Sequence, residues 1–293
     1  MREIFEGLKG IEVKKNFSLN KISSIGIGGK IRYLVKIKDK NSLPLLKEVI
    51  QKEKIKYVFI GKLTNLLFPD GYLDGVAIQY QDDFFEELGK DPPLFKVGAG
   101  MGLASLILKL RNLSVSGLEP LIGIPGTVGG AIKMNAGAFG FSISDFVKEI
   151  EVFSFKEGFK ILKKEKINFD YRFSSIGDDE LIISATFELK KDNYNNLIEK
   201  YLRIRNEKFP KGKSLGCIFK NPVGLIAGEL IEKAGLKNFR IGDAIISDKH
   251  ANFIINIKRA KFLDVYEMIQ IVKEKVQKKF NVLLEEEIKI MDI

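Results

Sequence analysis

A glycine-dense run in the middle of the chain limits the possible folds more than any other feature. The stretch SGLEPLIGIPGTVGGAIKMNAGAFG, residues 116–140, contains seven glycines in a largely apolar frame. Glycine adopts backbone conformations that other residues avoid, and its N–H group can approach a ligand with no side chain in the way. The run therefore predicts either a wall against a flat cofactor with a phosphate tail, or a pair of tight turns that flank a buried helix.

Short β-like segments and Gly-bearing turns fill the first part of the chain, and helical periodicity takes over after about residue 190. Strands are expected at 57–61, 64–68, 75–80, 94–100, 147–155, 180–189 and 281–290. Helices are expected at 42–54, with Ser42 as the N-cap, and at 103–110, 195–209, 225–236 and 262–276. We predict an α+β protein with a first domain at 1–190 and a smaller C-terminal α+β domain at 191–293.

Composition excludes several classes of protein. The chain has one cysteine and one histidine in 293 residues, so it can form no internal disulfide and offers no Cys/His cluster for a metal. No apolar run approaches the roughly 18–20 residues of a membrane span, and the start MREIFEGLKGIEVKK is too charged for a secretory signal. We therefore expect a cytoplasmic protein with no membrane partner and no metal.

The net charge of +10 arises from Lys and Glu residues that are interleaved along the whole chain. Nucleic-acid-binding proteins concentrate their basic residues on one face, whereas a generally basic surface attracts anions of many kinds. We predict an anionic small molecule such as a nucleotide, rather than nucleic acid, as the partner.

Three common motifs are absent from the sequence. The tripeptide GKS at 212–214 ends like a phosphate-binding P-loop, but Glu207 stands where that motif requires a glycine. The glycines of GAGMG at 98–102 lack the G-x-G-x-x-G spacing of a dinucleotide-binding Rossmann fold. No G-x-S-x-G nucleophile elbow occurs.

Besides the run at 116–140, six other segments match a known family, and they occur in that family's order over nearly the whole chain. The six are SSIGIGGKIRYLV (23–35), GKLTNLLFPDG (61–71), FDYRFSS (169–175), LGCIFKNPVG (215–224), AGLKNFRIGDAIISDKHANFIIN (234–256) and LLEEEI (283–288). Together they resemble the UDP-N-acetylenolpyruvoylglucosamine reductase (UDP-N-acetylmuramate dehydrogenase) family. The short interval between Arg172 and Cys217 is similar to the branch that lacks an extra substrate-capping loop.

The resemblance implies both a fold and a reaction. The implied fold is an FAD-binding α+β region (1–190) of the vanillyl-alcohol-oxidase/cresol-hydroxylase (PCMH) type with a C-terminal substrate-binding domain (191–293). The implied reaction is the NADPH-dependent, FAD-mediated reduction of UDP-N-acetylglucosamine enolpyruvate to UDP-N-acetylmuramate, a step of peptidoglycan precursor synthesis. The implied partners are this UDP-sugar enolpyruvyl ether and NADPH, and we expect a monomer.

The resemblance also implies three catalytic residues. Arg172 offers a fixed positive fork for a carboxylate, and Glu287 matches a glutamate that helps to polarise or protonate the enolic carboxylate. Cys217 stands where much of the family has a proton-donating serine. A thiol, with an ordinary pKa of about 8.5, is a much stronger acid than a serine hydroxyl but donates only while protonated. Taken alone, these residues are also typical of a surface arginine, a solvated strand edge and a small buried hydrophobe.

The remaining site residues follow from the same resemblance. The implied substrate-lining residues are Tyr171, Lys220, Asn221 and His250, of which the histidine alone is more often structural. The implied cofactor-binding residues are Gly61, Thr64, Asn65, Gly123, Pro125, Gly126, Thr127, Gly129, Gly130, Asn135 and Gly137.

The chain departs from the family pattern at two places. Leu63 replaces a glycine of the family's pyrophosphate loop at 61–65, so this loop is expected to take a less compressed path or to carry strain. FAD binding is expected to be retained but weaker. Phe139 replaces a tyrosine of many relatives, so any contact of that hydroxyl is absent here.

Two other functions remain open from the sequence. A flavin oxidoreductase of the same fold that acts on an alcohol or phenol would not need Arg172, Cys217 and Glu287 together. A flavin-linking His or Cys in the first domain would favour it, and residues 1–190 contain neither. The other alternative is a basic binding protein that has lost catalysis, for which the altered loop at 61–65 is the only indication.

Overall fold

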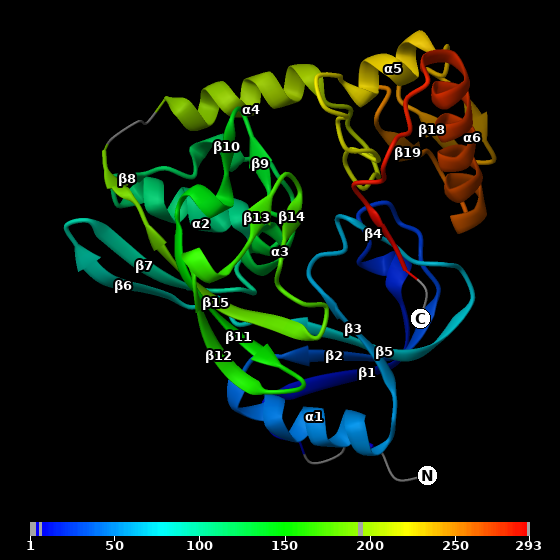
Figure 1. Cartoon of the computed structure of the whole chain (residues 1–293). Coiled ribbons are helices and arrows are strands. Elements are labelled where there is room, and N and C mark those ends of the chain that lie inside the picture. Colours follow the sequence, from blue (N-terminus) through cyan, green and yellow to red (C-terminus); the bar gives the residue numbers. More distant parts are fainter. Residues whose placement is uncertain (1–3, 6–7, 193–195, 292–293) are drawn as a thin grey trace. The chain divides into compact units, whose positions relative to one another are not determined.

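The computed structural model describes residues 4–5, 8–192 and 196–291, and it divides into two compact units (Figure 1). Unit 1 contains residues 1–16, 32–61 and 74–203, and unit 2 contains residues 17–31, 62–73 and 204–293. The sequence analysis assigns 17–31 and 62–73 to the first domain, whereas their contacts place them in unit 2. Neither unit is therefore continuous in sequence, and no single cut of the chain separates them.

A four-stranded sheet lies almost entirely in unit 1. Its strand order is β1 (Ile11–Ser18), β2 (Lys30–Ile37), β5 (Tyr72–Tyr80) and β3 (Lys56–Ile60), and β3 runs parallel to β5. Helix α1 (Leu43–Lys52) buries one apolar face in the same core as this sheet. Ser42 stands at its N-cap position, but the hydroxyl donates to the Asp39 carbonyl oxygen (2.6 Å) and makes no capping hydrogen bond.

An antiparallel five-stranded sheet forms the rest of the unit 1 framework. Its order is β12 (Gly158–Lys163), β11 (Val147–Ser154), β15 (Glu180–Glu188), β7 (Pro93–Gly98) and β6 (Phe85–Lys90). Residues 181–187 of β15 are all buried, as expected of a central strand covered on both faces. Strand β12 alternates between half-buried and exposed residues, which is typical of an edge.

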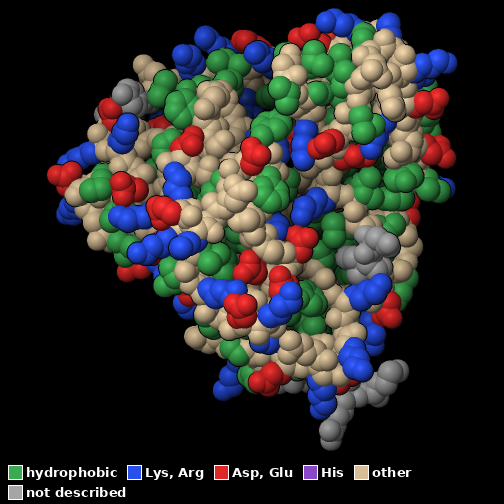
Figure 2. Space-filling model, in the orientation of Figure 1, with side chains coloured by type: hydrophobic (Ala, Val, Ile, Leu, Met, Phe, Trp, Pro, Cys, Tyr) green, Lys and Arg blue, Asp and Glu red, His purple; other side chains and the backbone are tan. Residues whose placement is uncertain are grey.

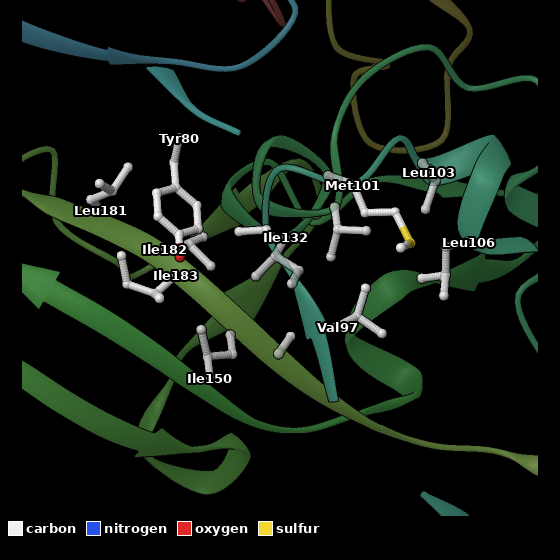
Figure 3. Packing of buried hydrophobic residues seen from close by; sticks show 14 of the residues in the cluster. Tyr80, Val97, Met101, Leu103, Leu106, Ile132, Ile150, Leu181, Ile182 and Ile183 are labelled. Carbon is white, nitrogen blue, oxygen red and sulfur yellow. The ribbon is translucent and has the colours of Figure 1, made fainter. Parts of the chain in front are cut away.

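Helices α2 (Leu103–Asn112) and α3 (Val128–Lys133) pack on this sheet. Figure 3 labels Leu103 and Leu106 of α2, Ile132 of α3, and Val97 and Ile150 of the strands, all of which belong to one hydrophobic cluster. The start of α3 is fixed on β7 because the Gly129 N–H donates to the Ala99 carbonyl oxygen (2.9 Å). A Cβ added at Gly129 would lie 3.0 Å from the Ala99 Cβ, so glycine permits this close approach.

Three two-residue strand pairs complete unit 1. They are β8 (Val115–Ser116) with β16 (Lys190–Lys191), β9 (Gly137–Ala138) with β10 (Phe141–Ser142), and β13 (Phe169–Asp170) with β14 (Phe173–Ser174). Helix α4 (Leu197–Lys208) follows and enters unit 2.

Unit 2 has its own hydrophobic core. Helix α6 (Phe262–Phe280) contributes Val265, Ile269, Val272 and Val276, all of which are buried, and the helix expected at 262–276 is confirmed. The helix packs with α5 (Ala227–Lys233) and an antiparallel sheet of β17 (Arg240–Ile241), β18 (Ala244–Ile246) and β19 (Ile254–Asn256). Strand β20 (Lys289–Ile290) runs parallel to β4 (Leu66–Leu67) and so joins the C-terminal segment to the inserted segment 62–73.

Most predicted elements are present, with shorter bounds at several places. The strands expected at 64–68 and 281–290 contain only β4 and β20, and the first residue of the helix expected at 195–209 lies outside the described residues. The sequence analysis does not predict strands β1, β2, β6, β8–β10, β12–β14 and β16–β19. Figure 2 shows basic and acidic side chains interleaved on the face in view, in agreement with the spread charge of the sequence.

Candidate active site

The glycine run forms both structures that its sequence suggests, a short buried helix and a glycine-lined loop. Thr127 is the N-cap of α3, and its Oγ1 accepts a hydrogen bond from the Gly130 N–H (3.1 Å). Gly123 and Gly126 precede it with φ angles of 80° and 145°. Both angles lie in the region that favours glycine. This loop therefore requires glycine at both positions.

The residues of this loop fit a phosphate-bearing cofactor such as FAD. Within the described ranges, the N–H groups of Gly123 and Gly126 donate no hydrogen bond to another protein group, and Gly123 is exposed. A Cβ added at Gly61 would lie 3.1 Å from Thr127 Oγ1, so the end of β3 meets the start of α3. Unit 1 thus brings three predicted cofactor residues, Gly61, Gly126 and Thr127, to one place. Free backbone N–H groups beside glycines are suited to bind phosphate oxygens.

Leu63 adopts the left-handed conformation expected of the glycine that it replaces. Its φ angle is 50° and its side chain is 1% exposed. Its carbonyl oxygen accepts from the N–H (3.2 Å) and the hydroxyl (3.3 Å) of Ser24. The conformation costs roughly 1–2 kcal/mol for a residue with a Cβ, whereas full burial of a leucine contributes about 1.5–3 kcal/mol. The expected strain is confirmed, and burial offsets it.

Arg172 lies at the turn of the β13–β14 hairpin in unit 1. Its φ angle of 56° is left-handed, and its Cζ lies 5.0 Å from the centre of the Tyr171 ring. The turn is fixed locally because the Tyr171 N–H donates to Asp170 Oδ1 (2.7 Å). A Cβ added at Gly137 would lie 3.4 Å from Arg172 Nη1, so the arginine approaches another predicted site residue. A non-glycine residue held in this conformation is often found at functional sites.

The side chain of Asn135 is hydrogen-bonded to the backbone of this hairpin. Its buried amide donates from Nδ2 to the Asp170 carbonyl oxygen (2.9 Å) and accepts at Oδ1 from the Ser144 N–H (3.3 Å). Both ends of the amide are therefore engaged by the protein. The sequence analysis expects a cofactor contact at Asn135, and the geometry gives its side chain a role in supporting the Arg172 turn.

The segment of unit 2 that contains Cys217, residues 217–219 (the Cys217 segment), lies between the segment of Asn252 and Phe253 and the segment of Glu287. Cys217 pairs with Phe253 in an antiparallel bridge, and the Ile218 N–H donates to the Asn252 carbonyl oxygen (2.9 Å). On the other side, the Ile218 carbonyl oxygen accepts from the Glu287 N–H (2.7 Å). Cys217 and Glu287, predicted from separate motifs, are therefore on hydrogen-bonded neighbouring segments.

The three adjacent glutamates have different environments. Glu286 forms an ion pair with Lys273 of α6 (2.9 Å), and Glu285 lies 3.5 Å from Lys220 Nζ with its own side chain 73% exposed. The Glu287 carbonyl oxygen accepts from Asn65 Nδ2 (3.1 Å), and Lys289 donates its N–H to the Asn65 carbonyl oxygen (2.9 Å). The expected cofactor residue Asn65 is thus hydrogen-bonded to the segment of Glu287 within unit 2.

The predicted substrate-lining residues of unit 2 differ in their surroundings. Asn221 Oδ1 accepts from the Ala227 N–H (3.0 Å) at the first residue of α5. The Lys220 N–H donates to the Glu285 carbonyl oxygen (2.9 Å), which places Lys220 beside the glutamate segment.

His250 lies in an aromatic cluster. Its ring centre is 5.4 Å from that of Phe209 and 5.1 Å from that of Phe253, and its Nδ1 accepts from the Asn252 N–H (3.3 Å). Burial lowers the pKa of His250 below 6.5, and the charge of Lys237 lowers it further. A neutral imidazole in such a cluster is typical of a packing role.

Sequence reasoning missed one residue of this region, Asn252. Asn252 is 3% exposed, and its side-chain amide is hydrogen-bonded to both the N–H and the carbonyl oxygen of Phe219. The sequence signal that could have indicated Asn252 is its position inside the apolar stretch ANFIIN (251–256). An amide buried in such a stretch usually forms hydrogen bonds with a specific partner.

Comparisons with known proteins extend over both units. The family description "FAD binding domain" matches residues 31–158, and "UDP-N-acetylenolpyruvoylglucosamine reductase, C-terminal domain" matches residues 207–291. The chain is 40% identical to the UDP-N-acetylenolpyruvoylglucosamine reductase of Thermotoga sp. (strain RQ2), with 99% of this chain and 98% of the relative covered. The same enzyme of Fusobacterium nucleatum is 36% identical, with 96% and 100% covered.

The chain belongs to the UDP-N-acetylenolpyruvoylglucosamine reductase family. A solved structure supports the same conclusion: the UDP-N-acetylenolpyruvylglucosamine reductase of Thermus caldophilus superposes with a TM-score of 0.83 at 32% identity, covering 96% of this chain and 100% of that one. The α+β fold class with an FAD-binding domain, expected from the resemblance, is confirmed.

Two features are absent from the described residues. None of the helices there has both the length and the hydrophobicity needed to span a bilayer. No group of three or more His, Cys, Asp or Glu residues in the same ranges is arranged to hold a metal ion.

We predict that Leu63→Gly destabilises the protein by about 2 kcal/mol, although it removes an unfavourable backbone conformation. The loss of a buried leucine costs about 3 kcal/mol or more, and the backbone relief returns about 1 kcal/mol. Urea unfolding measures the difference. The control is Lys54→Gly, which also removes a left-handed φ angle of 50° but at an exposed position, and it should be neutral or stabilising. A Leu63→Gly protein more stable than wild type would refute the anchoring role of this side chain.

The single histidine allows a direct test of its environment. We expect the imidazole proton signals of His250 to titrate with a midpoint below pH 6.5 in NMR spectra of the folded protein, because burial disfavours the charged ring. The unfolded chain then binds a proton more readily than the folded one, so this group lowers stability as pH falls below 6.5. A midpoint at or above that value would show that the ring is solvated or faces a carboxylate.

Proposed function

We propose that this protein is an FAD-dependent oxidoreductase that reduces UDP-N-acetylglucosamine enolpyruvate to UDP-N-acetylmuramate with NADPH, a step of peptidoglycan precursor synthesis. Membership of the family over nearly the full chain supports the reaction. The observation that carries it within this chain is the hydrogen bond between the Ile218 and Glu287 backbones, because it places the segment of the proposed acid Cys217 beside the segment of the proposed glutamate. A protein that had lost catalysis would not need these two segments to be neighbours.

The residues proposed to hold FAD are the glycine run and the loop at 61–65. The backbone N–H groups of Gly123 and Gly126 are suited to its phosphates, with Gly61 and Thr127 beside them and Pro125, Gly129, Gly130 and Gly137 completing the wall. Thr64 and Asn65 offer further donors. When bound, FAD supplies the two-electron chemistry that connects oxidation of NADPH to reduction of the enolpyruvyl double bond.

Three side chains carry the second half of the proposed reaction. A hydride is added to the methylene carbon of the enolpyruvyl group, which leaves negative charge on the neighbouring carbon and its carboxylate. Arg172 stabilises this charge through its guanidinium, and Glu287 polarises or protonates the carboxylate. Cys217 transfers its S–H proton to the carbon that bears the carboxylate, and the thiolate then takes a proton from water.

The remaining assignments concern recognition and context. We propose that Tyr171, Lys220, Asn221 and His250 line the nucleotide-sugar site, with Lys220 near the pyrophosphate. We propose that the predicted domain 1–190 binds FAD and that 191–293 binds the substrate. Segments 17–31 and 62–73, which belong to unit 2, would contribute to FAD binding as parts of the first of these domains. We propose that the protein is cytoplasmic, since NADPH and nucleotide sugars are cytoplasmic metabolites, and that it acts as a monomer.

We predict that Cys217→Ala separates the two half-reactions. Anaerobic rapid mixing should show reduction of the bound flavin by NADPH within about twofold of wild type, because no proton from Cys217 is needed there. Reoxidation by UDP-N-acetylglucosamine enolpyruvate should slow at least about 100-fold, the usual effect of removing a general acid.

Cys217→Ser is the matched control, because a hydroxyl of similar size keeps a transferable proton, and it should retain most of the reoxidation rate. Equal losses in both half-reactions of Cys217→Ala would contradict the acid role. A wild-type protein whose reduced flavin is not reoxidised by this substrate under anaerobic conditions would overturn the proposed function itself.

A further inference from the structure

The backbone just before Cys217 does little to fix the thiol. Gly216 has a φ angle of 82°, and a Cβ added there would have no atom within 4 Å. Glycine without neighbours restrains the chain weakly. Besides the bridge to Phe253, the residues that follow Cys217 therefore contribute to its orientation.

Asn252 fixes those residues through a reciprocal pair of hydrogen bonds. Its Oδ1 accepts from the Phe219 N–H (2.9 Å), and its Nδ2 donates to the Phe219 carbonyl oxygen (2.8 Å). Its own carbonyl oxygen accepts from the Ile218 N–H (2.9 Å), so one residue binds three main-chain groups of the Cys217 segment. The side-chain amide acts here as an additional member of a strand ladder, and a two-point contact fixes direction as well as distance.

The burial of this pair makes it costly to disturb. Asn252 is 3% exposed and Phe219 is 2% exposed, so water cannot easily replace the amide. Loss of the side chain would leave a buried N–H and a buried carbonyl without partners. The Phe219 segment would have to move to satisfy them, and Cys217 would move with it.

We propose that Asn252 is a positioning residue for proton transfer, which holds the thiol of Cys217 at the orientation that the reaction requires. This inference rests on the proposed function for its effect on rate, but the orientation of the thiol can be measured without turnover. Small displacements of a reacting group can lower a rate by about 100-fold.

Asn256 offers a matched control in the same unit. It is also a buried asparagine, 5% exposed, with both ends of its amide engaged. Its Nδ2 donates to the Ile25 carbonyl oxygen (2.9 Å), and its Oδ1 accepts from the N–H groups of Lys258 (3.2 Å) and Ala260 (2.9 Å). Its side chain therefore supports other segments and none of the residues 217–219.

The test compares Asn252→Ala and Asn256→Ala as FAD-loaded proteins. In Asn252→Ala we expect reoxidation of the reduced flavin by the enolpyruvyl sugar nucleotide to slow at least about tenfold at saturating substrate, with the half-saturating concentration and the rate of reduction by NADPH within about twofold. Asn256→Ala should keep all three values within about twofold of wild type even if its melting temperature falls. If Asn252→Ala does not fold, Asn252→Ser replaces it.

A spectroscopic readout tests the orientation directly. Cys217 is the only cysteine, so a trifluoromethyl thiol label reports on this residue alone in fluorine NMR spectra. We expect one narrow signal in the wild type and in Asn256→Ala, and a broadened or split signal in Asn252→Ala.

The outcomes distinguish this proposal from the function on which it rests. Equal rate losses in both variants, or an Asn252→Ala signal as narrow as that of wild type, would overturn the positioning role. A wild type that is not reoxidised by this substrate would overturn the function, and the fluorine spectra would still decide whether Asn252 orients the thiol.

Discussion

The arrangement of the Cys217 segment between two other segments of unit 2 is the constraint on which the proposed chemistry depends. The Ile218 N–H binds the Asn252 carbonyl oxygen on one side, and the Ile218 carbonyl oxygen binds the Glu287 N–H on the other. These bonds join parts of the chain that are far apart in sequence. Because Asn65 also binds the Glu287 carbonyl oxygen, a predicted cofactor residue, the proposed glutamate and the proposed acid share one hydrogen-bonded framework.

The three adjacent glutamates are held by different contacts. Glu286 pairs with Lys273, with both side chains about one-quarter exposed, and this pair attaches the segment to α6. Glu285 is largely exposed beside Lys220, where an ion pair contributes little. Glu287, in contrast, has its N–H and its carbonyl oxygen fixed by Ile218 and Asn65. Its backbone is therefore held as firmly as that of the cysteine segment.

The sequence was sufficient to predict what depends on local pattern. Helix α6 follows from apolar residues at helical spacing, whereas the roles of Cys217 and Glu287 are implied only by the resemblance of their short motifs to the family and stay predictions. The assignment of residues 17–31 and 62–73 to unit 2 depends on distant contacts, such as that between β4 and β20, which no local pattern encodes. Leu63 keeps a backbone conformation that favours glycine because the burial of its side chain outweighs the strain. Asn252 bonds the main chain of Phe219, and because main-chain groups are the same in every residue type, no sequence pattern marks this contact.

The central claim is that the thiol of Cys217 is the proton donor. Its most direct test is the pH dependence of reoxidation of the reduced flavin by substrate, measured for the wild type and for Cys217→Ser. A thiol donates only while protonated, so the wild-type rate should fall about tenfold per pH unit once the pH exceeds the thiol pKa, whereas a serine hydroxyl stays protonated and the variant should not show this fall. The same pH dependence in both proteins would contradict the claim.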